Sequence, residues 1–266
     1  MTSATPAPST TGARLLSAEA RFRYVLRLAD TSLVLGQRLG EWVGHAPALE
    51  EDLGLANIAL DLIGQARLLL AYAAQIEGRG RDEDALAFLR DAPEFYNASL
   101  AEQPNGDFGQ TIVRQFLLDA WQLELYEALS DSTDARLAEI AAKALKETRY
   151  HLRFSAGWVV RLGDGTAESH SRVEQALDTL WRFTDELLTP DALDEEVAGA
   201  GIGPSLTVLR PRWEARVGAV LEEATLKRPA ASRYPWHGKR GVHTEHLGHM
   251  LAEMQHLPRA FPGATW

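Results

Sequence analysis

Two helical segments carry acidic residues where a di-iron centre would place them, but they lack the accompanying imidazoles. Asp61 is followed three residues later by Gly64, and Glu147 is followed three residues later by Tyr150. In di-iron carboxylate helix bundles, two helices each supply a Glu-x-x-His pair and the other two each supply one more Glu. The pattern therefore separates two functions, an oxidising enzyme and a helical subunit that has lost the metal.

Polar residues recur at spacings of three and four on one face of four segments, as expected for facing helices. The aligned residues are Asp30, Val34, Gln37 and Glu41; Asn57, Asp61, Gly64 and Leu68; Gln115, Asp119, Gln122 and Tyr126; and Ala144, Glu147, His151 and Phe154. Because the segment around Asp61 is apolar on its other faces, we expect Asp61 to be buried. A buried carboxylate needs a metal, a cation or hydrogen bonds, or it stays protonated. Candidate cations are Arg114, Lys143, Lys146 and Arg149.

This strip has two interpretations, a di-iron site or a hydrogen-bonded network that fixes helix register. The di-iron ligands would be Glu41, Asp61, Asp119, Glu147 and His151. His151 is the only imidazole in the four segments and falls four residues after Glu147, whereas non-haem iron sites rely on imidazole beside carboxylate. We therefore favour the network and predict no catalytic, cofactor-binding or metal-binding residue. The vestigial positions are Glu41, Asp61, Gly64, Asp119, Glu147, Tyr150 and His151.

The C-terminal region holds most of the histidines and a basic loop. The histidines are His237, His243, His246, His249 and His256. Two imidazoles with Glu245 make a zinc site conceivable, but no H-E-x-x-H motif occurs, so we favour a helix that docks on the core or on a partner. The loop 227–240 is rich in basic residues and either meets an anionic ligand or acidic partner or is simply solvated.

Composition indicates one large helical domain that does not bind nucleic acid. The chain has 266 residues and a formal net charge of −10, which favours one core and argues against nucleic acid as a partner. No unbroken apolar run of 18 residues occurs, so we expect no membrane-spanning helix. The absence of cysteine excludes disulfides, Fe–S clusters and thiol catalysis and fits a cytoplasmic location. Residues 1–18 read as a disordered tail without a secretory signal.

Helical periodicity dominates the remaining chain, and no strand-like alternation is present. Long helices are predicted over about 19–43, 49–75, 110–129 and 135–162, with a long connection at 78–109, a short helix near 82–90 and later helices over 169–188, 211–226 and 243–257. Two long hairpins joined by one long connection are typical of the ferritin-like arrangement. We predict an all-α, ferritin-like four-helix bundle with additional C-terminal helices over residues 19–266.

Three long strings of this chain resemble one family. They are LGQRLGEWVGHAPALEEDLGLANIALDLIGQARLLL, KETRYHLRFSAGWVVRLGDGTAESHSRVEQALDTLW and HTEHLGHMLAEMQHLPRAFPGATW. The chain resembles, from about Tyr24 to Trp266, the structural C subunits of bacterial phenylacetyl-CoA ring epoxidases, which are multicomponent monooxygenases. Strings of this length are far more specific than any short motif.

The resemblance implies a ferritin-like subunit without a working metal centre and with no cofactor of its own. Its partners would be a homologous catalytic A subunit that holds the di-iron centre, a small B subunit and a reductase with FAD and Fe–S that uses NADPH. Two alternatives stay open. One is a divergent di-iron oxygenase that uses Asp61, Glu147 and His151, and the other is a module that holds the CoA moiety through Lys239 and Arg240.

Overall fold

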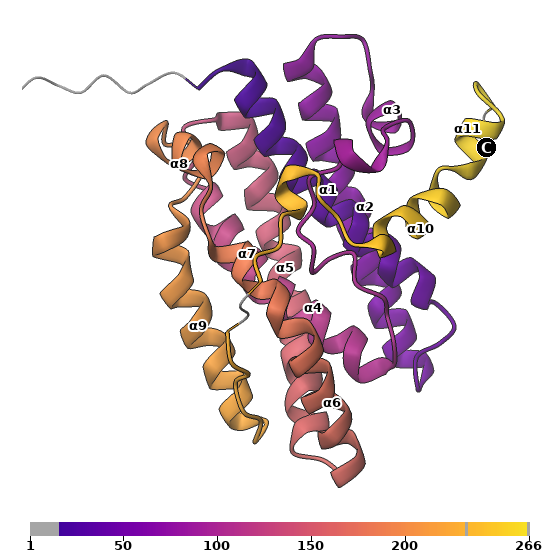
Figure 1. The fold of residues 1–266 in the computed structure, drawn as a ribbon, viewed down its shortest axis with the longest axis vertical. Helices are drawn as coiled ribbons and strands as arrows, with labels where there is room; N and C mark the ends of the chain where they lie inside the picture. The colour runs from indigo at the N-terminus through magenta and orange to yellow at the C-terminus, as the bar shows by residue number, and fades with distance from the viewer. Residues whose placement is uncertain (1–15, 232–233, 265–266) are drawn as a thin grey trace, which may run out of the picture.

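The structure is a computed structural model that describes residues 16–231 and 234–264 (Figure 1). Within these residues it is helical, with no strand beyond an isolated bridge between His237 and Val242. The helices are α1 (Ala18–Trp42), α2 (Leu49–Glu77), α3 (Glu83–Phe88), α4 (Phe108–Leu129), α5 (Ala135–Gly163), α6 (Ala167–Leu180), α7 (Thr184–Leu188), α8 (Ala192–Gly199), α9 (Leu206–Glu223), α10 (Glu245–Met254) and α11 (His256–Ala260). The prediction of an all-α chain is confirmed. The tail expected over residues 1–18 lies mostly outside the described residues.

Local signals set the ends of the four long helices. The Ser17 hydroxyl accepts a hydrogen bond from the Ala20 amide at 3.1 Å, and Asp107 and Asp134 cap α4 and α5 in the same way, which satisfies amides that a helix start leaves free. The turn between α1 and α2 is held by the Asp52 carboxylate, which accepts from the Gly44 amide at 2.8 Å. α2 ends at Gly78, whose φ of 65° is left-handed and suits glycine.

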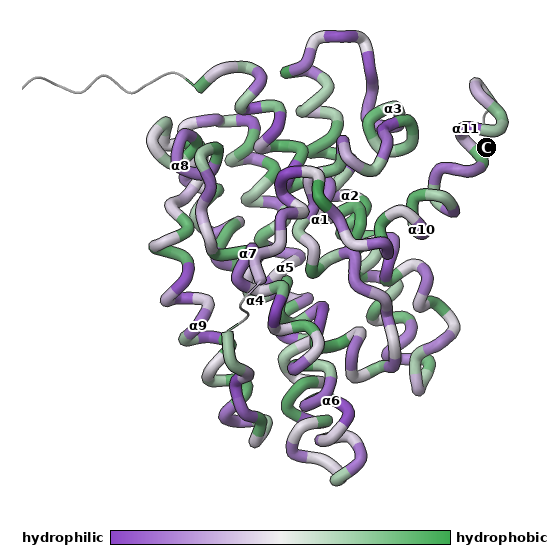
Figure 2. Tube along the Cα trace, in the orientation of Figure 1, coloured by the Kyte–Doolittle hydropathy of each residue, from purple (hydrophilic) through white to green (hydrophobic). Residues whose placement is uncertain are grey.

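The hairpins α1–α2 and α4–α5 pack on each other around one continuous core. Glycine permits the close approach of α1 to α2, since a Cβ on Gly36 would lie 3.0 Å from the Ile63 side chain. Hydrophobic residues recur along these packed helices, whereas the stretch between α2 and α3 is mostly hydrophilic (Figure 2). Residues buried at the centre include Val34, Leu62, Phe116 and Leu145.

The second half of the long connection between α2 and α4 is buried, unlike an ordinary surface loop, since residues 97–103 are all buried. Phe95, Leu100 and Glu102 are fully buried. The C-terminal segment that precedes α10 covers it, because His243 bonds to both Glu102 and Phe95. This half of the connection is therefore an inner part of the fold.

The later helices differ in part from the prediction. Residues 169–188, expected as one helix, form α6, a 3₁₀ turn at Trp181–Phe183 and α7. The break occurs where Trp181 and Phe183 are both buried, Trp181 tilted against Trp213 of α9. α8 was not predicted, and α9 begins at Leu206 instead of Pro211. α10 and α11 lie at one side of the molecule (Figure 1).

α2 is the one helix in the described part of the chain that is long and apolar enough to cross a membrane by length and composition alone. The core helices of soluble proteins pass the same test. α2 contains Asp61 and Arg67, and one side of it packs along α1. Only 44% of its most apolar 18-residue stretch is buried, so much of its outer side is exposed.

Candidate functional site

A strip of polar side chains runs through the core between α4 and α5. The Asp119 carboxylate is fully buried and accepts hydrogen bonds from Gln115 Nε2 and Ser155 Oγ, both at 2.7 Å. Burial raises the pKa of Asp119 to about 6, although nearby His151 and these two hydrogen bonds act in the opposite direction. The donors to this acid are thus neutral groups, and none is a metal ligand of the usual type.

His151 is fully buried on α5 and points toward α2. Its Nε2 donates to Asp61 Oδ2 at 3.0 Å, since a carboxylate can only accept. The Asp61 side chain is 40% exposed. The prediction that Asp61 is buried was therefore wrong, because the apolar outer residues of α2 face solvent instead of a protein core.

A second chain of hydrogen bonds links α1, α4, α2 and α5. Ser32 Oγ lies 3.3 Å from Tyr126 Oη, Tyr126 donates to Gln65 Oε1 at 3.3 Å, and Gln65 Nε2 donates to Glu147 Oε2 at 3.0 Å. Burial raises the pKa of Tyr126 to about 12, so its hydroxyl stays protonated. Lys143 lies 3.7 Å from the Glu147 carboxylate. This chain fixes the register of four helices, as the network interpretation requires.

The remaining vestigial positions do not converge on Asp119. Glu41 pairs with Arg38 at 2.8 Å near the end of α1. Tyr150 is 43% exposed, and a Cβ on Gly64 would meet no atom within 4 Å. Gly64 and Tyr150, the positions where a di-iron helix would carry histidine, therefore do not sit in the packed core.

The described residues do not fit a di-iron centre. No three His, Asp or Glu side chains among them gather closely enough to hold a metal ion. Both Asp119 oxygens already accept hydrogen bonds, and the one imidazole in the strip is directed at Asp61. The arrangement can fix helix packing, and it offers no open ligand set for iron.

Two of the candidate cations, Arg114 and Arg149, bind away from Asp119. Arg114 is fully buried on α4 and donates to the Gln103 carbonyl and to Asn105 Oδ1, both at 2.6 Å. Burial lowers its pKa to about 9. Arg149 lies 3.7 Å from Glu127. Arg114 therefore holds the long connection in place and does not neutralise Asp119.

Sequence reasoning named Asp30 and His243 but missed the charged partners through which they hold the connection and the C-terminal segment. Asp30 forms a fully buried ion pair with Arg90 and accepts from the Tyr96 amide at 2.8 Å. His243 Nδ1 donates to Glu102 Oε2 at 2.8 Å. Burial lowers the pKa of His243, but hydrogen bonding and charge from Glu102 outweigh it, so that pKa is raised. The partners are about 60 and 140 residues apart in sequence, and no local pattern could have found them.

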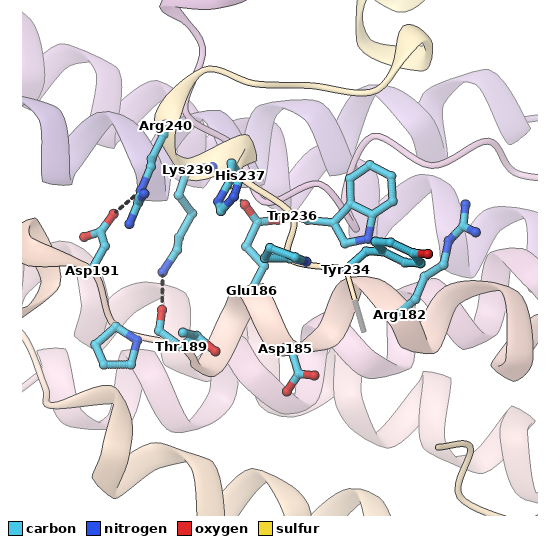
Figure 3. Close-up of a pocket in the computed structure, with 12 residues that line it drawn as sticks. Arg182, Asp185, Glu186, Thr189, Asp191, Tyr234, Trp236, His237, Lys239 and Arg240 are labelled. Atoms are coloured by element: carbon cyan, nitrogen blue, oxygen red, sulfur yellow. Dashed lines mark hydrogen bonds and ion pairs between the residues drawn. The ribbon is translucent and has the colours of Figure 1, made fainter. Parts of the chain in front are cut away.

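The basic loop borders a pocket of about 100 Å³ beside α7 (Figure 3). Arg182, Tyr234 and Trp236 gather at one end, with the Arg182 guanidinium over the Trp236 ring. At the other end Lys239 Nζ donates to Asp194 at 2.8 Å, and Arg240 Nε lies 3.5 Å from Asp191. The two cations that were candidates for binding CoA thus already pair with carboxylates.

Comparisons with known proteins place the chain in a family. The family model described as phenylacetic acid catabolic protein matches residues 7–266, so the chain belongs to this family. The chain is 56% identical over 243 residues to the C subunit of the 1,2-phenylacetyl-CoA epoxidase of Escherichia coli strain K12, and the match covers 91% of this chain and 98% of that protein. The resemblance inferred from the three sequence strings is confirmed.

A solved structure shares the fold. It is a protein with aldehyde deformylating oxidase activity from Synechococcus, with a TM-score of 0.54, 80% of this chain and 95% of that chain covered, and 15% sequence identity. At this identity the likeness concerns the helical architecture alone.

Proposed function

We propose that this chain is a non-catalytic structural subunit of a phenylacetyl-CoA 1,2-epoxidase complex, built as a ferritin-like four-helix bundle with C-terminal helices. It stabilises and positions a homologous catalytic subunit that holds the di-iron centre. The other components are a small B subunit and a reductase with FAD and Fe–S that draws on NADPH, all in the cytoplasm. The identity to the C subunit of the Escherichia coli epoxidase, which extends over nearly the whole of both chains, supports the assignment.

The observation that carries the non-catalytic role is the state of Asp119. This acid occupies the middle of the polar strip, and its two oxygens accept from an amide and a hydroxyl. A metal ligand needs an ionised carboxylate with a free lone pair directed at the ion. Both oxygens of Asp119 are instead used by Gln115 and Ser155, and in the described part of the chain no three His, Asp or Glu side chains gather to complete a ligand set.

The second candidate function is a divergent di-iron oxygenase, and the Asp61–His151 contact at 3.0 Å is the observation in its favour. Reconstitution with iron distinguishes the two candidates. The isolated chain is loaded anaerobically with ferrous iron, desalted, exposed to O₂ and assayed for metal and for oxidised phenylacetyl-CoA. We expect no stoichiometric iron and no product. Two tightly bound irons per chain, or turnover without another subunit, would show that the chain is itself an oxygenase.

A matched variant sharpens the assay. His151→Ala removes the only imidazole of the strip. If iron binding is adventitious, the variant and the wild-type chain retain the same small amount. A loss of metal specific to His151→Ala would favour the oxygenase.

A further inference from the structure

His243 lies at the start of residues 243–264, which we call the C-terminal arm, and its ring contacts the connection between α2 and α4. The side chain is only 5% exposed. Its Nδ1 lies 2.8 Å from Glu102 Oε2, and its Nε2 lies 2.8 Å from the backbone carbonyl oxygen of Phe95. Because a carbonyl oxygen can only accept a hydrogen bond, Nε2 carries a hydrogen. Whether Nδ1 carries one as well depends on the state of Glu102.

The surroundings of Glu102 favour an ionised carboxylate. This side chain is fully buried. Its Oε1 accepts from the Thr244 amide at 2.6 Å, and its Oε2 accepts from Asn97 Nδ2 at 2.9 Å. Hydrogen bonds from N–H donors stabilise a carboxylate over the neutral acid. Oε2 therefore accepts from His243 Nδ1 too, and a ring that donates from both nitrogens is an imidazolium.

Charges on the neighbouring elements support this state. Burial alone would lower the pKa of His243, but the hydrogen bond and charge of Glu102, the Phe95 carbonyl and the charge of Glu186 on α7 outweigh it and raise that pKa above 6.5. The other charged or titratable groups beside His243 or in contact with its partners are Arg38 of α1, Arg90 and Lys239, together with Glu245 and His246 of the arm itself.

Each of the three neighbouring cations has a carboxylate of its own. Arg38 pairs with Glu41 at 2.8 Å, Lys239 Nζ pairs with Asp194 at 2.8 Å, and Arg90 pairs with Asp30. Their charges are offset locally, so the imidazolium lies between Glu102 and Glu186 without a bare cation beside it.

We propose that His243 is a pH-sensitive switch, which holds the C-terminal arm on the connection while the ring is an imidazolium and loosens the arm when the ring loses a proton. A neutral ring keeps one N–H. One nitrogen would then direct a lone pair at a buried oxygen that can only accept, and that contact is lost. The far end of the arm stays attached through Gln255, whose Nε2 donates to the Arg90 carbonyl at 2.9 Å.

The arm has few other contacts with which to resist this loss. Its helices α10 and α11 lie at one side of the molecule (Figure 1). The buried residues among those described in the arm are Leu247, Met250, Leu251 and Gln255. Segments with so few buried apolar contacts open locally at a small cost in free energy, so the arm can loosen while the bundle stays folded.

The direction of the pH dependence follows from the raised pKa. In the loosened arm the ring is solvated and has its ordinary pKa of 6.5, whereas the attached ring has a higher one. The contribution of His243 to attachment is therefore fully present below pH 6.5 and is lost as pH rises through the pKa of the attached state. Within this window loosening releases one proton, so the ratio of loosened to attached arm rises up to tenfold per pH unit.

Hydrogen exchange of the full-length chain, followed by mass spectrometry between pH 5.5 and pH 9, measures the loosening. Rates are corrected for the exchange of unstructured peptides at each pH. In peptides that cover residues 243–254 and 95–103, the corrected rate should rise up to tenfold per pH unit above pH 6.5 and then level off. A peptide from α4 should show no such rise.

Two variants at histidines of the arm separate the switch from other causes. His243→Gln removes the titrating group, so its arm should exchange faster than the wild-type arm at pH 6 and lose the pH dependence. His249→Gln is the matched control, because His249 lies on α10 and is exposed. This control should follow the wild-type chain at every pH.

The protonation state is checked on the wild-type chain, so that no outcome depends on the folding of a variant. Nitrogen NMR of chain labelled at histidine with ¹⁵N should show two protonated ring nitrogens for His243 at pH 6 and a titration above pH 6.5. Three results overturn the inference. They are a neutral His243 ring at pH 6, which would place the proton on Glu102; corrected exchange of the arm that stays constant while the ring titrates; and an equal rise in α4, which would mean global unfolding.

Discussion

Two regions of this molecule bury carboxylates, and they stabilise them in opposite ways. Between α4 and α5, Asp119 is surrounded by an amide and a hydroxyl, and its pKa is raised to about 6. Beside α1, Asp30 pairs directly with the Arg90 guanidinium, and both are fully buried. The first region leaves an acid without a direct cationic partner in the core, whereas the second uses paired charges to attach a long connection.

The difference indicates what each region contributes. The Asp30–Arg90 pair is one of several ionic contacts that fasten distant segments, along with Arg27 to Asp191 at 2.6 Å and Glu102 to His243 at 2.8 Å. These pairs define where the connection and the C-terminal segment lie. Asp119 fastens only α4 to α5, through Ser155, and two packed helices need no buried acid for that purpose.

The largest expected effect comes from breaking the paired region. Arg90→Ala leaves Asp30 buried without its cation and removes donors to the Leu86 and Glu94 carbonyls. Loss of one partner from a buried ion pair costs about 3–5 kcal/mol, so we expect a fall of this size in the free energy of unfolding, measured by urea denaturation at pH 7.

The control for Arg90→Ala is Arg67→Ala, which removes an exposed pair with Glu83 at 3.3 Å. Exposed pairs contribute about 0–1 kcal/mol. Equal losses in the two variants would show that Asp30 is solvated and that the connection is not held by this pair.

The second prediction concerns Asp119. Here the substitution should raise the free energy of unfolding, whereas Arg90→Ala lowers it. Asp119→Asn keeps the shape of the side chain and removes its charge. Its amide nitrogen replaces one acceptor oxygen, and the Ser155 hydroxyl can accept from it while it donates to the Leu152 carbonyl. The pKa of Asp119 is raised in the folded state from 3.8 to about 6, so its contribution to stability is fully present below pH 3.8 and is lost as pH rises through 6. At pH 7 the variant should be more stable than the wild-type chain, by roughly 3 kcal/mol at most.

Denaturation of both chains between pH 4 and pH 7 measures this difference. The advantage of Asp119→Asn should grow across that window and level off above pH 6, where the acid of the wild-type chain is ionised. A variant that is less stable than the wild-type chain at pH 7 would mean that the ionised carboxylate holds the strip together.

The sequence predicted the long helices well, because their apolar period and caps are local signals. It predicted the strip less well, and the reason lies in α2. This helix is apolar on nearly every side, so its sequence does not indicate which side faces the core, and Asp61 was assigned to the interior although its side chain is 40% exposed. The Asp30–Arg90 pair joins residues 60 positions apart, and periodicity carries no information about such contacts.

The smallest expected effect concerns Asp61 and tests whether its carboxylate is exposed. Asp61 is intermediate between Asp30 and Asp119, because its partner His151 is buried while its own carboxylate is partly solvated. Asp61→Ala removes the acceptor of His151 Nε2. Water can replace it in part because this edge is open, so we expect a loss of about 1 kcal/mol, as for an ordinary hydrogen bond. Asp61→Asn, which keeps an acceptor oxygen, should lose less, and the order of the two variants in urea denaturation checks the role of the contact. A loss from Asp61→Ala as large as that from Arg90→Ala would mean that the Asp61–His151 pair is shielded from water in solution.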